Sequence, residues 1–235
     1  MCYSNSSTST NVQLAERYKR KIPDSVSEIP VFCASGFTFP EWRIVTKDET
    51  IQVMNWGLIP QWFKGSDPSS IASKTLNAKL ETLTEKASFR HLIERNRCIV
   101  PSTGFFEWQT RGNVKIPYFI YPKDDSVFSM AGLMDQWLTS DGKLKRTFTI
   151  ITCPANELMS EIHNLKKRMP VILNQENEVD WLTGQLPLKA FQTPFSSALM
   201  DAHEVNRSLI NGKNHNQSDV QQPYSNGYFS QGTLF

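Results

Sequence analysis

Short β-prone runs recur along most of this 235-residue chain and constrain its fold more than any other feature of the sequence. Each run is rich in Val, Ile, Phe, Tyr or Trp and is bounded by Gly, Pro or a polar turn, which is typical of strands. The runs occupy residues 30–46, 51–56, 97–108, 116–122, 127–137, 146–153 and 169–173. Their close spacing, with few helical segments between them, predicts an α+β fold with a largely antiparallel, barrel-like β-sheet core.

A few short helices are expected to flank this sheet. Asn11 is predicted to cap a helix over residues 12–21, and Asn156 to cap another over residues 157–163, because Asn side chains satisfy the first free N–H groups of a helix. A third helix is predicted near residues 88–94.

The chain reads as one domain followed by a tail. No linker interrupts residues 1–210, so we expect a single domain there. Residues 211–235 are rich in Asn, Gln, Ser and Gly and poor in aliphatic residues, which predicts a weakly ordered tail. We expect a monomer, because nothing in the sequence suggests an interface.

Composition excludes several classes of protein. The net charge of +2 is too small to indicate a nucleic-acid-binding protein by itself, although local clusters of cations can still form a basic groove. The four cysteines are widely spaced, with no C-x-x-C pair, so we expect no metal and no cofactor. No apolar run is long enough to span a membrane or to serve as a signal peptide, and we therefore expect a reducing, cytoplasmic location.

Cys2, directly after Met1, is the first candidate for chemistry. Removal of the methionine would make Cys2 a 1,2-aminothiol, whose amine has a reference pKa of roughly 7.7–8.0 and whose thiol has one of roughly 8.5. Such an amine attacks an aldehyde to form a Schiff base, and the adjacent sulfur can close onto the imine to give a thiazolidine. The alternative is an ordinary residue at a frayed terminus.

Three further side chains are candidates for proton transfer or positioning. Glu107 lies in the aromatic run FFEW, where burial would raise its carboxyl pKa, but it could equally face water on an edge strand. His163 ends a predicted helix and either donates a proton or satisfies free helix carbonyls. Asn77 either hydrogen-bonds a nucleophile or substrate, or serves turn geometry.

Aromatic and basic residues suggest contacts with a single strand of nucleic acid. Trp62 and Phe63 follow Pro60 on a predicted turn, where they could stack on bases or pack in the core. The three consecutive cations at residues 166–168 form either a phosphate-binding loop or a solvated one.

Taken in order, these motifs resemble the SOS-response-associated peptidase (SRAP) family of abasic-site processing proteins. The resemblance covers roughly the first 210 residues. The matching motifs are Met1-Cys2, WGLIPQW at 56–62, NAKLET at 77–82, FR at 89–90, CIVPSTGFFEW at 98–108, ITCPAN at 151–156, IH at 162–163 and RMPVIL at 168–173. Because eight motifs recur in the family's order, chance is a poor explanation.

The resemblance implies a protein that traps abasic sites in single-stranded DNA through a thiazolidine crosslink at Cys2, with removal of its own Met1 and weak strand-cleaving lyase activity. Asn77 would position the terminal amine or the deoxyribose, while Glu107 and His163 would act as acids and bases. The DNA contacts implied by position are Trp62, Phe63, Lys79, Arg90, Arg168 and Phe37.

The chain departs from the family pattern at several of these positions. Tyr3-Ser4 replaces the usual Gly-Arg, and Lys79 replaces an Arg that would meet phosphate with two parallel hydrogen bonds. Four residues separate His163 from Arg168, more than is usual, so His163 keeps its role only if they loop out. Phe37 is assigned as a wedge against the base stack because the family's usual residues are missing there.

Two other functions remain open from the sequence. One is an N-terminal-nucleophile cysteine hydrolase or peptidase in which Cys2, Glu107 and His163 act on an amide. The other is a non-covalent single-stranded DNA-binding module in which Cys2 is incidental, so that binding would survive its replacement by alanine.

Overall fold

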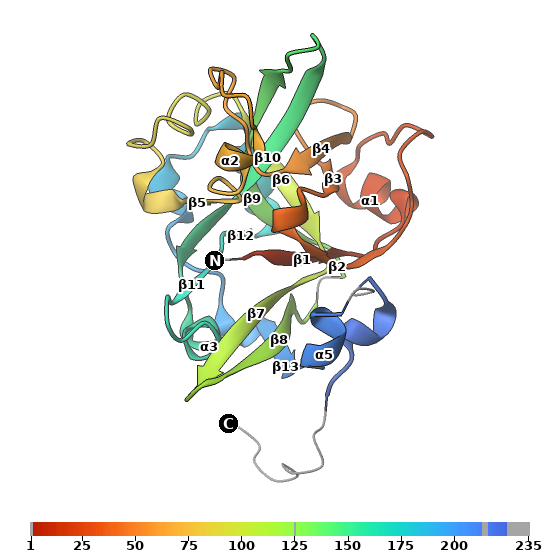
Figure 1. Cartoon of the computed structure of the whole chain (residues 1–235), viewed down its shortest axis with the longest axis vertical. Helices are drawn as coiled ribbons and strands as arrows, with labels where there is room; N and C mark the ends of the chain where they lie inside the picture. Colours follow the sequence, from red (N-terminus) through yellow and green to blue (C-terminus); the bar gives the residue numbers. More distant parts are fainter. Residues whose placement is uncertain (1, 125, 213–215, 225–235) are drawn as a thin grey trace.

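Two β-sheets and several short helices make up the computed structural model, which describes residues 2–124, 126–212 and 216–224 (Figure 1). The five-stranded sheet has the order β13 (Met200–Glu204), β8 (Val114–Pro122), β7 (Gly104–Arg111), β1 (Ser4–Ser7) and β2 (Val31–Ser35). All four of its pairings are antiparallel.

The eight-stranded sheet follows the path β12 (Ile172–Leu173), β9 (Phe128–Leu138), β10 (Leu144–Pro154), β4 (Gln52–Trp56) and β3 (Glu41–Ile44). Three strands lie off this path: β11 (Arg168–Pro170) and β5 (Asn77–Lys79) pair with β10, and β6 (Arg97–Ser102) pairs with β9. Only the pairings of β10 with β4 and with β5 are parallel among the described strand pairs. The predicted α+β, largely antiparallel fold is confirmed, and neither sheet closes into a full barrel along its described strands.

A shared hydrophobic core joins the two sheets. Phe105 on β7 and Phe128 on β9 meet ring to ring with centroids 6.5 Å apart, and both are fully buried. Trp56 on β4 stacks on Phe148 on β10 at 6.3 Å in the same cluster. The first strand, β1, runs across the middle of the molecule (Figure 1), where it pairs with both β2 and β7. The segment that carries Cys2 is therefore anchored centrally.

The helices are short and flank the sheets: α1 (Asn11–Tyr18), α2 (Ser69–Ala72), α3 (Glu157–Ile162), α4 (Glu178–Thr183) and α5 (Arg207–Ile210). Asn156 caps α3 as predicted, with its side-chain oxygen accepting from the Met159 N–H at 2.9 Å. No helix in the described ranges has both the length and the apolar character that a bilayer crossing requires.

Two helix predictions were wrong in detail. The cap of α1 is Thr10 rather than Asn11, because Thr10 and Gln13 form a reciprocal capping box. Asn11 instead begins the helix and accepts a hydrogen bond from Arg43. The helix expected over residues 88–94 is a succession of tight turns, which leads directly into β6.

The polar segment after residue 210 differs from expectation where it is described. Val220 is fully buried, and the Gln221 side chain donates to Ser6 Oγ at 2.6 Å and to the Phe32 carbonyl at 2.7 Å. The Asn216 side chain also accepts from the Phe32 N–H. Residues 216–224 therefore cover the edge of β2, and the rest of the expected tail, 213–215 and 225–235, lies outside the described residues.

Candidate functional site

Cys2 lies just before β1 and is held from both sides. Its side chain is fully buried, and its Sγ is 3.7 Å from the Ser4 carbonyl. Asn77, the first residue of β5, donates from Nδ2 to the Cys2 carbonyl at 2.8 Å. Burial, and to a smaller extent the Glu107 carboxylate, raise the pKa of the Cys2 thiol far above its usual value. Cys2 is thus a fixed residue of the interior, with Glu107 close enough to act on it.

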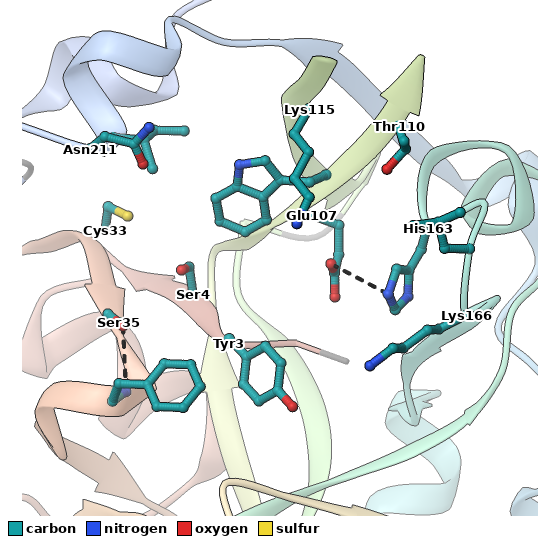
Figure 2. Close-up of a pocket in the computed structure, with 14 residues that line it drawn as sticks. Tyr3, Ser4, Cys33, Ser35, Glu107, Thr110, Lys115, His163, Lys166 and Asn211 are labelled. Atoms are coloured by element: carbon teal, nitrogen blue, oxygen red, sulfur yellow. Dashed lines mark hydrogen bonds and ion pairs between the residues drawn. The ribbon is translucent and has the colours of Figure 1, made fainter. Parts of the chain in front are cut away.

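Glu107 on β7 is the buried carboxyl group of the site. It is 4% exposed, and burial raises its pKa to about 7. A carboxyl group with this pKa is partly protonated near neutral pH and can both donate and accept a proton. Its Oε2 lies 3.9 Å from Nε2 of His163 (Figure 2).

His163, which directly follows α3, is oriented by the backbone. Its Nδ1 is 2.9 Å from the Arg168 carbonyl, which can accept a hydrogen bond from it, and 3.3 Å from the Arg168 N–H, which can donate one to it, so the Arg168 backbone orients the ring in either neutral tautomer. The other ring nitrogen, Nε2, faces Glu107. Burial lowers the pKa of His163, which favours the neutral form. The pair therefore places an imidazole next to the carboxyl group whose charge acts on the Cys2 thiol.

The four residues between His163 and Arg168 loop out, as the sequence argument required. The Lys167 N–H donates to the His163 carbonyl at 2.8 Å, and Lys167 adopts a left-handed backbone with a φ of 47°. Asn164 fastens the loop to β7 through hydrogen bonds with the backbone of Thr110. This turn returns the Arg168 carbonyl to His163 despite the longer spacing.

A cavity of about 480 Å³ opens beside Glu107 and His163, and we call it the Glu107 cavity (Figure 2). Aromatic and apolar side chains supply much of its wall. Its lining includes Tyr3, Phe37, Trp108, Lys115, Lys166 and Asn211. Phe37 is 54% exposed and contacts Tyr3 with ring centroids 5.0 Å apart.

A second cavity of about 740 Å³, which we call the Trp62 cavity, includes Asn77 in its lining. The sequence-predicted residues Trp62, Phe63 and Lys79 all line it, and Trp62 is 50% exposed. Two further lysines, Lys74 and Lys86, also line it. Asn77 lines this cavity and bonds the backbone of Cys2, while Tyr3 and Ser4, which follow Cys2, line the Glu107 cavity. The neighbours of Cys2 therefore reach two cavities that both carry aromatic rings and lysines.

The two arginines predicted to contact phosphate, Arg168 and Arg90, lie outside both cavities. The Arg168 guanidinium is paired with both carboxylate oxygens of Glu81 and also donates to the Thr152 carbonyl, and its side chain is only 12% exposed. Arg90 is exposed on the turns before β6. Neither arginine lines the two cavities.

Sequence reasoning assigned no role to Trp108, Lys115 or Asn211, and it treated Tyr3 only as a departure from a family pattern. Trp108 directly follows Glu107 on β7, and because successive side chains of a strand point to opposite faces, no local pattern indicated that both would line one cavity. Lys115 comes from β8, which pairs with β7, and this pairing could not be read from the sequence. No cluster of side chains in the described part of the chain has the make-up of a metal site.

A family model, SOS response associated peptidase (SRAP), matches residues 1–211. The chain belongs to the SRAP family. Its match covers every side chain of the site described above.

Curated relatives support the same family membership. The chain is 36% identical over 208 residues to the abasic site processing protein YoqW of Bacillus subtilis. The matched region covers 82% of this chain and 90% of the relative. It is 37% identical over 158 residues to the abasic site processing protein HMCES of Gallus gallus, covering 58% of this chain and 46% of the relative.

Solved structures share the SRAP fold described here. A Bacteroides thetaiotaomicron protein superposes with a TM-score of 0.89 at 40% identity, covering 95% of this chain and all of that chain. A Bordetella bronchiseptica protein superposes with a TM-score of 0.76 at 21% identity, covering 87% of this chain and all of that chain, and supports the fold alone.

Proposed function

We propose that this SRAP protein recognises abasic sites in single-stranded DNA and captures them covalently through Cys2. The observation that carries the proposal is the setting of Cys2: Asn77 holds its carbonyl, the Glu107 carboxyl group of the Glu107–His163 pair acts on its thiol, and its neighbours line two cavities that carry aromatic rings and lysines. Relatives named abasic site processing proteins indicate the kind of DNA lesion.

The covalent step requires a free amine on Cys2, and hydrolysis of the Met1–Cys2 bond supplies it. The amine nitrogen then attacks C1′ of the ring-opened sugar, and loss of water leaves an imine. The Cys2 sulfur adds to the imine carbon while the thiol proton ends on the nitrogen, which closes a thiazolidine. No oxidant or metal enters this sequence of steps.

Each neighbouring side chain has a defined part in that chemistry. Glu107, with a pKa of about 7, is suited to deliver a proton to the departing oxygen and to recover it later. His163 presents Nε2 as a base for the thiol, whose raised pKa makes such help necessary. Asn77 fixes the Cys2 carbonyl, so the nucleophile does not need to be ordered when the aldehyde arrives.

The same residues serve the family's peptidase chemistry and a weak lyase side reaction. In this proposal, Glu107 and His163 activate the water that hydrolyses the Met1–Cys2 bond. A Schiff base that is not closed by sulfur can instead undergo elimination of the neighbouring phosphate, which cuts the strand.

The two cavities suit a single strand that crosses the site. Aromatic faces stack on bases of any sequence, and lysines attract the phosphate backbone. The Trp62 cavity offers Trp62 and Phe63 with Lys74, Lys79 and Lys86 on one side of Cys2, and the Glu107 cavity lies on the other side.

Denaturing electrophoresis tests the proposal. Purified protein, with loss of Met1 confirmed by intact mass, is incubated with a single-stranded oligonucleotide that carries one abasic site, and in parallel with the intact oligonucleotide. A band shift that survives denaturation is expected only with the abasic strand, and Cys2→Ala should abolish it.

The controls separate the alternatives. Cys2→Ser retains the amine but lacks the thiol, so it should give an adduct that is trapped by borohydride and otherwise reverses. Correctly processed protein that forms no adduct would rule the proposal out. If wild-type protein forms no adduct, cleavage of a peptide supplied in trans would favour a hydrolase, and equal DNA affinity of wild type and Cys2→Ala would favour a binding module.

A further inference from the structure

The Glu107 cavity extends beyond the groups that the proposed chemistry uses. Besides Glu107 and His163, its lining includes Cys33, Trp108, Lys115 and Asn211 (Figure 2). Its volume of about 480 Å³ falls within the range of small-ligand sites. This space is larger than a sugar lacking its base would fill.

The wall of this extension includes one large aromatic side chain, Trp108. Trp108 is half-buried and packs against the small hydrophobic cluster that contains Phe106 and Phe119, while it also lines the cavity. The buried residues Cys33 and Ile210 also line the cavity. A tryptophan fixed in this way suits stacking by a flat aromatic group such as a nucleobase.

The charged groups around the cavity favour an anion. Lys115 lies on one side of the Glu107–His163 pair and Lys166 on the other (Figure 2). Neither lysine forms an ion pair with a carboxylate anywhere in the described ranges, whereas Arg168 nearby is committed to Glu81. Glu107 is the only acidic residue of the lining, so the two lysines outnumber it. A phosphate group therefore complements this cavity.

We propose that this extension of the Glu107 cavity is a subsite for the intact nucleotide next to the abasic sugar. The base of that nucleotide lies against Trp108, its phosphate is bound by Lys115, and the Asn211 amide is available to its polar edge. This inference rests on the proposed function, since it names what the same site binds beside the lesion. It assigns roles to Trp108, Lys115 and Asn211, which covalent capture alone does not require.

Three strands test the subsite by comparison of initial crosslinking rates at protein concentrations below saturation. The first carries one abasic site between normal nucleotides. In the second and third, the nucleotide on the 5′ or the 3′ side is replaced by tetrahydrofuran, which keeps the phosphate but has no base and no aldehyde. With wild-type protein the rate should fall about tenfold on one side only, and that side is the one that occupies the subsite.

Variants connect this difference to the cavity. Trp108→Ala should crosslink all three strands at the lower rate, whereas Trp108→Phe, which keeps an aromatic ring, should retain most of the difference. Lys115→Ala should weaken binding of every strand and reduce its salt dependence, while the matched control Lys47→Ala, an exposed lysine away from both cavities, should behave as wild type. Thermal melting checks that each variant is folded.

The outcomes distinguish the two proposals. If wild-type protein crosslinks none of the strands, the proposed function fails. If it crosslinks all three at equal rates, covalent capture stands and the subsite is refuted. A difference that persists unchanged in Trp108→Ala also refutes the subsite, because the preference would then come from the DNA or from the Trp62 cavity.

Discussion

The buried Glu107 carboxyl group should make the protein less stable as the pH rises through neutrality. Its pKa is 4.5 in an unfolded chain and about 7 in the folded protein. Between these values the folded protein retains a proton that the unfolded chain has released. The free energy of unfolding therefore falls as the pH increases across this window, which is the opposite of the effect of a salt-bridged carboxylate.

The size of the effect follows from the two pKa values. Raising a pKa from 4.5 to about 7 corresponds to about 3 kcal/mol of stability lost between pH 4.5 and the alkaline side of the window. Glu107→Gln has a similar shape and no charge, so it should lack this loss. Relative to wild type, the variant should gain about 3 kcal/mol in free energy of unfolding between pH 4.5 and pH 8.5.

Urea denaturation of both proteins at half-unit pH steps measures this difference. The comparison removes most contributions of other groups, including His163. The lowered pKa of His163 makes the free energy of unfolding rise with pH, which is opposite to the effect of Glu107. A stability difference between wild type and Glu107→Gln that stays constant from pH 4.5 to pH 8.5 would contradict the reasoning. It would mean that Glu107 is not a carboxyl group with a raised pKa.

Three other substitutions test separate parts of the structure. Asn77→Ala removes the 2.8 Å bond to the Cys2 carbonyl and should slow crosslinking about tenfold with little change in DNA affinity, as measured by gel time courses and by fluorescence anisotropy. Gly104→Ala would place a Cβ 2.1 Å from the Phe119 ring and should lower the free energy of unfolding by about 2 kcal/mol; an unchanged urea midpoint would show that the ring moves away freely. Val220→Ala should cost about 1.5 kcal/mol in the same assay if the segment unfolds together with the domain, and nothing if it does not.

Local patterns in the sequence predicted the strands and some of the caps. Strands are short and closely spaced here, and alternation with turn residues such as Gly142 marks their limits. The Asn156 cap is a contact between neighbouring residues, and such contacts are encoded locally. The cap of α1 was misplaced by one residue because Thr10 and Asn11 are both good caps, and the partner Gln13 decides between them.

Contacts between distant residues were harder to predict. Arg168 follows two other cations in the sequence, which suggested a phosphate contact. In the structure it pairs instead with Glu81, which lies 87 residues earlier. The two residues meet because β11 and β5 both pair with β10. The packing of Val220 likewise depends on a surface near β2, almost 190 residues away. Composition described the polar character of that segment correctly, but its burial depends on the fold as a whole.

The anchoring of the strand that follows Cys2 also has a consequence in time. β1 pairs with β7, about a hundred residues later in the chain, and the site is complete only when His163 is present. At synthesis rates of roughly 5–20 residues per second, Cys2 emerges from the ribosome many seconds before the residues that bury it. A processing enzyme can reach residue 1 of the nascent chain during that interval, whereas after folding the removal of Met1 depends on the self-processing proposed above.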